Sequence, residues 1–353
     1  MTLIPAHNEG PNIAATLRSL TEQSRRPDRT TVVSDNSTDD TVAVARAEGA
    51  RVMESVGNTA KKAGALNQAL ARLLPTLNDE DGILVLDADS VIAPDFLATA
   101  ELRLSADPGL GAVGGIFHGL PGEGLLGQLQ RNEYLRYGRD IARHQGRVMV
   151  LTGTASVIRV GALREIAAAR GHTLPGTEGR VYDTLALTED NELTLALKML
   201  GRRLVSPPEC RVLTEIMPTW RDLWRQRMRW QRGALENLRQ YGLNRVTARY
   251  WLQQIGMGVG AVALSLYLLL MVITAVMGGW AVEPLWIAVG LIFLVERVTT
   301  VWRGGGRARA LASPLVIELA YDLFVQAVFV RSLIDIATRR TAQWHHAGQK
   351  EAT

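Results

Sequence analysis

Two carboxylates follow a short apolar segment in the first third of the chain. Residues 82–86 read Gly-Ile-Leu-Val-Leu, and Asp87 and Asp89 come directly after them. Such a run is typical of a buried strand in a mostly parallel sheet, and ligands bind at the carboxyl ends of such strands. If the chain stays extended here, both carboxylates point the same way, and their hard oxygens suit a divalent cation. The alternative is a solvated Asp-x-Asp turn.

A second pair of acids, Glu189 and Asp190, follows Thr188 at the start of a predicted helix over residues 191–200. Thr188 is a good N-cap residue, and acids in the first turn complement the helix dipole. Capping alone would therefore explain this pattern, and the residues by themselves leave a functional role open.

The segments that must position these acids alternate between strands and helices. Strands are predicted at residues 3–4, 31–34, 50–53 and 83–86, and helices at 12–23, 41–48 and 63–74. Farther along, helices are expected at 94–105 and 125–143, and strands at 110–117 and 149–159. This alternation predicts an α/β fold in which helices cover a mostly parallel sheet.

Two nucleotide-binding motifs can be excluded. Gly109, Gly111 and Gly114 match the dinucleotide fingerprint in their spacing, but a helix precedes them and an extended run follows. The fingerprint needs the reverse order, a strand before and a helix after. The chain also contains no P-loop pattern, which argues against an NTPase.

Length, charge and cysteine content narrow the possible classes of protein further. The chain has 353 residues, enough for one large domain or two, and its net charge of +4 is too small to indicate nucleic-acid binding. Cys210 is the single cysteine, which excludes an internal disulfide framework and fits a reducing compartment. The strand-like start at Met1 predicts no signal peptide.

Residues 219–241 combine apolar bulk with basic residues at helical spacing. The apolar residues are Trp220, Leu223, Trp224, Trp230, Leu235 and Leu238, and the basic ones are Arg221, Arg225, Arg227, Arg229, Arg232 and Arg239. This pattern fits an amphipathic helix in a membrane interface. A core helix with a solvated basic face and a nucleic-acid surface are the alternatives, the second weakened by the apolar segments that follow.

Three hydrophobic segments close the chain, at residues 251–279, 285–302 and 311–335. The first is long enough to span a membrane, and the second is marginal in length. The third carries charged residues that lipid would penalise unless they face protein or water, namely Glu318, Asp322, Arg331 and Asp335. We expect two to three membrane helices, with an interfacial or re-entrant segment as the alternative for one of them.

Seven short motifs occur in a specific order along the chain. They are Pro5-Ala6-His7-Asn8-Glu9, Asp35, Lys62-Ala63-Gly64-Ala65-Leu66-Asn67, Asp87-Ala88-Asp89, Thr152-Gly153-Thr154, Thr188-Glu189-Asp190 and Gln226-Arg227-Met228-Arg229-Trp230. Each motif is weak alone. The ordered set, followed by membrane segments, strongly resembles the membrane-embedded, inverting family-2 glycosyltransferases, the processive synthases of cellulose, chitin, hyaluronan and poly-N-acetylglucosamine. The resemblance covers nearly the whole chain.

The resemblance implies a GT-A catalytic domain that binds a nucleotide-diphospho-sugar, usually a UDP-sugar, together with Mg²⁺ or Mn²⁺. The residues implied to bind nucleotide are Pro5, Glu9, Asp35, Lys62, Asp87 and Asp89, the last two also as metal ligands. The residues implied to act in catalysis are Asp190 as general base, its neighbour Glu189, and Gln226, Arg229 and Trp230 beside the acceptor and the diphosphate. The acceptor-side loop is Thr152-Gly153-Thr154, with Trp230 as a flat face for a sugar ring.

The implied organisation has four parts. They are a cytoplasmic GT-A domain at 1–215, amphipathic interfacial helices at 216–249, a membrane region at 250–338 and a basic tail at 339–353. The resemblance implies an integral protein of the inner or plasma membrane, whose partners are the nucleotide-sugar, a polysaccharide or lipid-linked acceptor and the bilayer. Partner subunits or a homo-oligomer would complete a translocation path, and no nucleic acid is expected.

Three hypotheses for function follow. The first is a processive synthase that extends a polysaccharide. The second is a transferase that adds one sugar to a lipid or another acceptor, which suits the short membrane part. The third is an inactive membrane subunit that binds sugar or nucleotide for a partner, and the intact acids argue against it.

Overall fold

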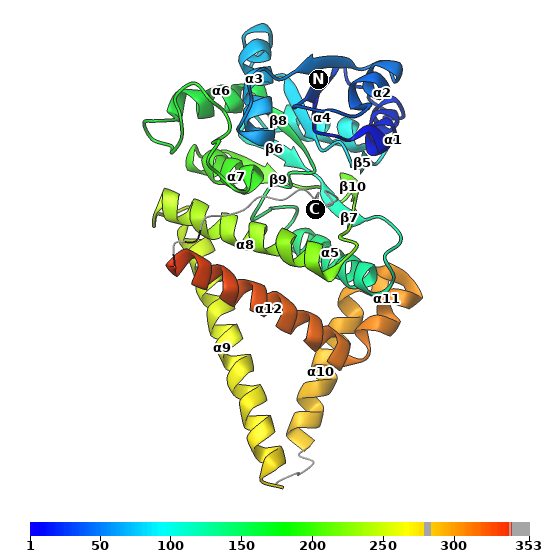
Figure 1. The fold of residues 1–353 in the computed structure, drawn as a ribbon, viewed down its shortest axis with the longest axis vertical. Coiled ribbons are helices and arrows are strands. Elements are labelled where there is room, and N and C mark those ends of the chain that lie inside the picture. Colours follow the sequence, from blue (N-terminus) through cyan, green and yellow to red (C-terminus); the bar gives the residue numbers. More distant parts are fainter. Residues whose placement is uncertain (279–283, 339, 341–353) are drawn as a thin grey trace. The chain divides into compact units, whose positions relative to one another are not determined.

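A computed structural model describes residues 1–278, 284–338 and 340 of the chain. The predicted basic tail, apart from Arg340, lies outside the described residues. The chain divides into two compact units (Figure 1). Unit 1 comprises residues 1–121, 137–216 and 239–241, and unit 2 comprises 122–136, 217–238 and 242–353.

Unit 1 is built on a seven-stranded sheet with the strand order β3-β2-β1-β4-β8-β6-β9. The strands are β1 (Thr2–Ala6), β2 (Thr30–Ser34), β3 (Arg51–Glu54), β4 (Gly82–Leu86), β6 (Leu110–Gly114), β8 (Ala155–Arg159) and β9 (Arg203–Val205). Strand β8 runs antiparallel to its neighbours β4 and β6, and the other pairs of adjacent strands are parallel. The predicted mostly parallel α/β sheet is therefore confirmed.

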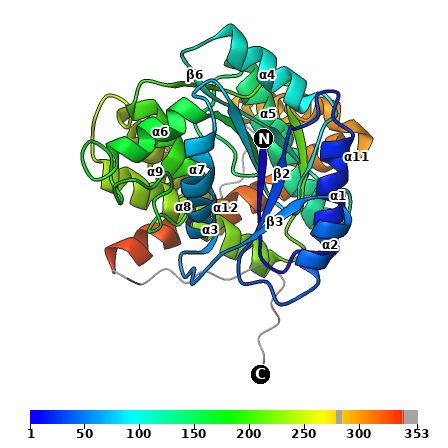
Figure 2. The ribbon, with the colours of Figure 1, turned by 90° about the horizontal axis from the view of Figure 1, so that it is seen from above.

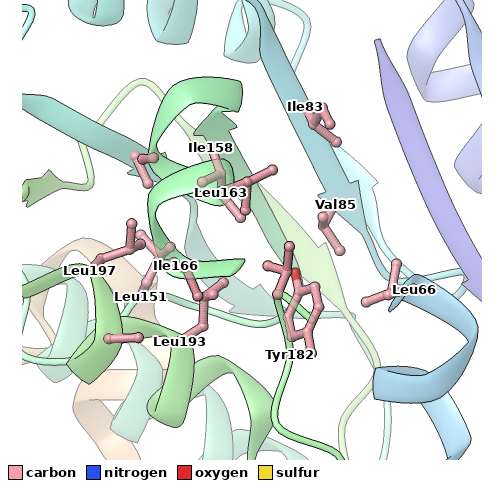
Figure 3. Close-up of a cluster of buried hydrophobic side chains, with 14 of the residues drawn as sticks. Leu66, Ile83, Val85, Leu151, Ile158, Leu163, Ile166, Tyr182, Leu193 and Leu197 are labelled. Atoms are coloured by element: carbon pink, nitrogen blue, oxygen red, sulfur yellow. The ribbon is translucent and has the colours of Figure 1, made fainter. Parts of the chain in front are cut away.

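Helices cover both faces of this sheet, as Figure 2 shows. Their bounds are α1 (Gly10–Thr21), α2 (Thr41–Ala47), α3 (Lys61–Leu73), α4 (Phe96–Ala106), α6 (Val160–Ala169) and α7 (Glu189–Met199), and a short 3-10 helix, η1 (Leu74–Thr76), follows α3. Side chains alternate between the faces of β4. Ile83 and Val85 pack in the cluster that contains α3, α6 and α7 (Figure 3), whereas Leu84 packs in the cluster with α1 and α4. The apolar strand before Asp87 is thus buried on both sides.

A second sheet of three strands, β5 (Val91–Ile92), β10 (Arg211–Thr214) and β7 (Ile116–Gly119), corrects one prediction. The strand expected over residues 110–117 is two strands, β6 and β7, which belong to different sheets. The chain changes sheet at Gly115, where an added Cβ would lie 2.3 Å from a methyl carbon of Val212. The strand expected over 149–159 likewise begins only at Ala155.

Unit 2 is helical. Its elements are the first part of α5 (Gly124–Arg143), most of α8 (Trp220–Tyr241), α9 (Ala248–Val276), α10 (Pro284–Thr300), the 3-10 turn η2 (Trp302–Gly304), α11 (Gly305–Ala312) and α12 (Leu315–Ala337). Among the described residues, α9 is long and apolar enough to cross a membrane. Helix α10 with the segment 302–312 qualifies only as a pair bent by 53°.

Two of the charged residues of α12, Glu318 and Asp322, face protein, whereas Arg331 is exposed. Glu318 is 2% exposed and accepts two hydrogen bonds from the Arg136 guanidinium, both of 2.9 Å. Asp322 is paired with Arg297 of α10. These contacts meet the condition under which acids are tolerated in such a segment. Helix α12 is accordingly not one of the candidate spans.

Helix α8 begins at Thr219, whose hydroxyl accepts a hydrogen bond from the backbone of Asp222 at 3.1 Å. The helix agrees with the predicted amphipathic segment, but its basic residues are not all solvated. Arg227 is buried and pairs with Glu133 of α5 at 2.8 Å. Tyr321 of α12 donates to the same carboxylate at 2.6 Å.

Candidate active site

The end of β4 places Asp87 against a lysine. The strand stops at Leu86, and the backbone turns at once, with the Ser90 amide 3.2 Å from the Asp87 carbonyl. The extended conformation that would align Asp87 and Asp89 on one face is therefore wrong. The turn aims Asp87 at α3, where the Lys62 ammonium donates to its carboxylate at 2.6 Å.

Lys62 joins two segments that lie far apart in the sequence. Its ammonium nitrogen is also 2.9 Å from a carboxylate oxygen of Glu189, at the start of α7, and 3.3 Å from the carbonyl oxygen of Gly153. Burial alone would lower the pKa of Lys62, but the carboxylates of Asp87 and Glu189 raise it well above its usual range. The lysine is therefore a fixed positive charge between the two acidic motifs.

Asp190 lies beside the Thr152-Gly153-Thr154 loop. The Gly153 amide donates to its carboxylate at 3.1 Å, and the amide of Asn191 donates to the other carboxylate oxygen at 2.7 Å. A Cβ on Gly153 would lie only 2.9 Å from Asp190 Oδ2, so this close approach requires glycine. The side chain of Thr188, at the N-cap, makes no capping hydrogen bond. The acids of this motif thus do more than cap a helix.

Glu9 and Asp89 complete a crowded group of acids. Glu9, at the N-terminus of α1, accepts a hydrogen bond from Asn12 at 3.1 Å, and Asp89 accepts one from Ser90 at 3.0 Å. Burial, with repulsion from Asp89, Glu215 and Asp87, raises the pKa of Glu9 to about 7. We call Glu9, Asp87, Asp89, Glu189, Asp190 and Glu215 the acid cluster.

Burial disfavours the ionised form of two acids in the cluster despite Lys62. Burial raises the pKa of Asp87 to about 6, although Lys62 opposes the shift more strongly than Asp89 or Glu189 adds to it. Burial, and to a lesser extent the carboxylate of Glu215, likewise raises the pKa of Asp89. Acids whose ionised form is disfavoured in this way would gain from a bound cation.

Pro5 and Asp35 lie at the carboxyl ends of two neighbouring strands, β1 and β2. The Asp35 amide donates to the Ala6 carbonyl at 2.8 Å. Its carboxylate accepts hydrogen bonds from Ser55 at 2.6 Å and Asn58 at 2.8 Å. Asp35 is thus held by the loop after β3.

Gln226, Arg229 and Trp230 lie on α8, within unit 2. Arg227, which was not among the predicted site residues, contacts two of them. It donates to the Gln226 carboxamide at 3.1 Å and places its guanidinium carbon 4.3 Å from the centre of the Trp230 ring. A catalytic role for the three predicted residues stays a prediction.

Two further residues were missed. Glu215 follows β10, and no local pattern distinguishes it. Its link to Asp89 arises because β10 pairs with β5, which follows the Asp87 turn. Tyr182, in the loop before α7, lines a small cavity together with Lys62, Glu189 and Asp190. Sequence gave no signal for either residue, because both depend on long-range packing.

The acid cluster suits a divalent cation that is also coordinated by substrate phosphates and water. Within residues 1–278, 284–338 and 340, no three His, Cys, Asp or Glu side chains are arranged to hold a metal ion. Asp87 and Asp89 therefore offer an incomplete set of oxygen ligands. This fits Mg²⁺ or Mn²⁺, which bind through one or two carboxylates together with substrate phosphates and water.

Comparison with known proteins gives a family and relatives. The family described as "Glycosyltransferase like family 2" matches residues 1–233. A poly-beta-1,6-N-acetyl-D-glucosamine synthase of Staphylococcus aureus is 25% identical over 242 residues, which are 67% of this chain and 54% of the relative. The Staphylococcus epidermidis synthase is 24% identical over 243 residues, with the same coverage. The chain spans about half the length of these curated relatives.

Among solved structures, a mannosyltransferase from Pyrobaculum calidifontis in complex with GDP-Man and Mn²⁺ is similar, with a TM-score of 0.61 and 18% identity. The match covers 96% of this chain and 87% of that chain. At this identity the likeness speaks for the fold alone, and it confirms the predicted GT-A architecture.

Proposed function

The chain belongs to glycosyltransferase-like family 2, and from this premise we propose that it moves a sugar from a nucleotide-diphospho-sugar to a hydroxyl of a growing polysaccharide. A UDP-sugar is the first choice of donor, and the configuration at the sugar carbon is inverted. The contact that carries the proposal is the Lys62 ammonium, which bridges Asp87 and Glu189. It brings the implied donor-binding acids and the implied base motif to one site.

The donor would bind along the ends of β1, β2 and β4. Pro5, Glu9 and Asp35 lie where the nucleotide is expected, and Asp87 and Asp89 would hold Mg²⁺ or Mn²⁺ through their oxygens. When bound, the ion supplies Lewis-acid neutralisation of the diphosphate, which makes that group a better leaving group. Lys62 adds a fixed positive charge within contact of Asp87.

Asp190 is the proposed general base. An acceptor hydroxyl must lose its proton as it attacks the sugar, and a carboxylate within hydrogen-bond reach can take that proton. The Gly153 and Asn191 amides each donate to one oxygen of Asp190, so its carboxylate is held in one orientation. Both oxygens keep lone pairs that could accept the acceptor hydroxyl. The loop 152–154 would then help to seat the acceptor.

The α8 motif and the membrane helices complete the proposal. Arg229 has a planar fork that suits diphosphate oxygens, and Trp230 offers a flat face to a sugar ring. Helix α9 would anchor the chain in a lipid bilayer, with the acid cluster on the cytoplasmic side. Partner subunits or a homo-oligomer would be needed to form a path for a long polymer.

A second candidate is the transfer of a single sugar to a lipid acceptor. The observation that favours it is α9, a described helix long and apolar enough to cross a membrane, which would hold the site near an acceptor embedded in lipid.

One experiment separates the two candidates. Membranes containing the protein are incubated with Mn²⁺ and radiolabelled donors, starting with UDP-N-acetylglucosamine and including GDP-mannose, and the products are sized by mass spectrometry. The polysaccharide proposal predicts a ladder of products, and the lipid proposal predicts a single addition. Release of free sugar and nucleotide without any glycosylated product would contradict both. Donor binding without turnover would instead support an inactive binding subunit.

A further inference from the structure

Tyr182 is a buried residue that the proposed mechanism does not use. It lies in the loop between α6 and α7, its ring is 3% exposed, and Figure 3 shows it among buried apolar side chains. The same residue lines the small cavity that is also bordered by Lys62, Glu189 and Asp190. An apolar core and the polar end of the proposed site therefore meet at this one side chain.

The Tyr182 hydroxyl has no hydrogen-bond partner among the residues that the structure describes. Burial raises the pKa of Tyr182 above its ordinary value. The charge of Lys62 lowers this pKa, and the charges of Glu189 and Asp190 raise it, so all three charges act on the hydroxyl. The hydroxyl is not one of the fully buried polar atoms that lack a partner, so it keeps some contact with solvent and is open to a ligand.

Asn67 fixes the backbone of this tyrosine. Its side-chain carbonyl accepts hydrogen bonds from the amides of Val181 and Tyr182, at 3.1 and 2.9 Å, and its amide group donates to the Tyr182 carbonyl at 2.8 Å. Asn67 ends the motif that begins with Lys62, one and a half turns earlier on α3. One helix therefore holds both the lysine and the loop that carries the tyrosine.

Arg170 fixes the same loop from the other side. All five of its N–H groups are used, on the carbonyls of Pro175 and Val181 and on both carboxylate oxygens of Glu192. Arg170 and Glu192 are both fully buried, and Glu192 lies two residues after Asp190 on α7. This ion pair ties the tyrosine loop to the helix that carries the proposed base.

We propose that Tyr182 is a positioning residue of the transferase site, whose hydroxyl donates a hydrogen bond to the Glu189–Asp190 carboxylates when the substrates are bound. Asn67 and Arg170 hold it in place for that contact. Catalytic hydrogen bonds are often unmade in the ligand-free enzyme and form only in the substrate complex, which accounts for a hydroxyl kept without a partner. The inference rests on the proposed function, since it concerns the same reaction.

The test is Tyr182→Phe, which removes one oxygen atom. Initial rates are measured on purified protein in detergent, with Mn²⁺ and UDP-N-acetylglucosamine or the donor that the panel selects, and thermal unfolding is followed in parallel. We expect kcat to fall roughly tenfold to hundredfold, the size of one lost hydrogen bond to a charged group. The donor KM should stay within about twofold, and the Tm should not fall, because no hydrogen bond of the free protein is lost.

Tyr137→Phe is the matched control. The Tyr137 hydroxyl is also largely buried but donates to the Val150 carbonyl at 3.2 Å. Its loss should lower the Tm and leave kcat unchanged, the reverse of the pattern expected for Tyr182→Phe. Asn67→Ala should lower kcat as well, and adding it to Tyr182→Phe should lower kcat little further, because both act through one contact.

Two results would overturn the inference. One is a Tyr182→Phe variant whose kcat stays within about twofold of wild type, and the other is a fall in kcat that comes with a matching fall in Tm, which indicates a purely structural role. Both are distinct from failure of the proposed function. In that case the wild-type protein itself would transfer no sugar.

Discussion

The two units of the chain treat buried charge in opposite ways. In unit 1, burial disfavours the ionised form of several members of the acid cluster although Lys62 contacts two of them, and it raises the pKa of Glu9 to about 7. In unit 2, the carboxylates of Glu133, Glu318 and Asp322 each form an ion pair with an arginine. We call these three acids, with Arg227, Arg136 and Arg297, the paired cluster.

We interpret this difference as one between a proposed ligand-binding site and a site that holds helices together. Buried charges are stable when they are paired, and the paired cluster joins α5, α8, α10 and α12 in this way. In the acid cluster, Glu215 is exposed and the other five acids are half-buried with Lys62 between Asp87 and Glu189, an arrangement that suits a bound cation and a diphosphate. Removing an acid should therefore have opposite effects on stability in the two units.

The largest effect is expected on turnover. Asp190→Asn keeps an oxygen for the Gly153 amide to donate to, but it cannot accept a proton, so turnover should fall roughly a thousandfold. Binding of UDP in the presence of Mn²⁺ should be unchanged. Product formation from labelled donor measures the first effect, and calorimetry measures the second. Near-normal turnover would show that the base has been misassigned, and Asp140→Asn, an exposed acid on α5, is the control that should keep full activity.

The next effect is on the stability of unit 2. Glu318→Gln leaves Arg136 without its bidentate carboxylate and should lower the free energy of unfolding by about 3 kcal/mol. Unfolding in detergent, followed by circular dichroism, gives this value. Glu296→Gln is the matched change at a residue that is 53% exposed and should cost less than about 0.5 kcal/mol. Equal effects of the two changes would contradict a structural role for the paired cluster.

Much of the fold and of the acid cluster could be predicted from the sequence, but not all of it. The apolar run before Asp87 and the Thr-Glu-Asp pattern at the start of α7 are local signals, and they placed both acidic motifs on the correct elements. The ordered motifs also led to Lys62. Local pattern could not show that Glu215 joins the acids, because that depends on pairing between β10 and β5.

The burial of Arg227 could not be predicted from the sequence either. Its position among other arginines predicted an amphipathic helix in a membrane interface, with a solvated basic face as an alternative, yet Arg227 is buried against Glu133 and Trp230. The partners of a charged residue come from other helices, so helical spacing does not reveal them. The same holds for Tyr182, whose cavity is lined by residues of α3, α7, the strands β4 and β8 and two loops.

The smallest predicted effect is that of Glu9→Gln on the free energy of unfolding, and it has the opposite sign from that of Glu318→Gln. Glu9 binds its proton more tightly in the folded protein, with a pKa near 7 against an ordinary 4.5, so wild type loses stability as the pH rises between these values. Glu9→Gln removes the loss and should stabilise the metal-free protein by about 2 kcal/mol at pH 8, after allowance for partial exposure.

Denaturant unfolding at several pH values measures the Glu9 effect, and the difference from wild type should vanish near pH 4, where both side chains are neutral. Glu22→Gln, on the exposed surface just after α1, should change stability by less than about 0.5 kcal/mol throughout. A Glu9→Gln protein that is less stable than wild type at pH 8 would mean that the acid cluster is already compensated.

The most direct measurement is calorimetric titration of UDP into the protein with and without Mn²⁺. If the acid cluster is the donor site, wild type and Asp190→Asn bind UDP in a Mn²⁺-dependent manner, and Asp89→Ala loses roughly tenfold to hundredfold in affinity. Mn²⁺-dependent binding of UDP to Asp89→Ala at the wild-type affinity would contradict the assignment of this cluster as the site of sugar transfer.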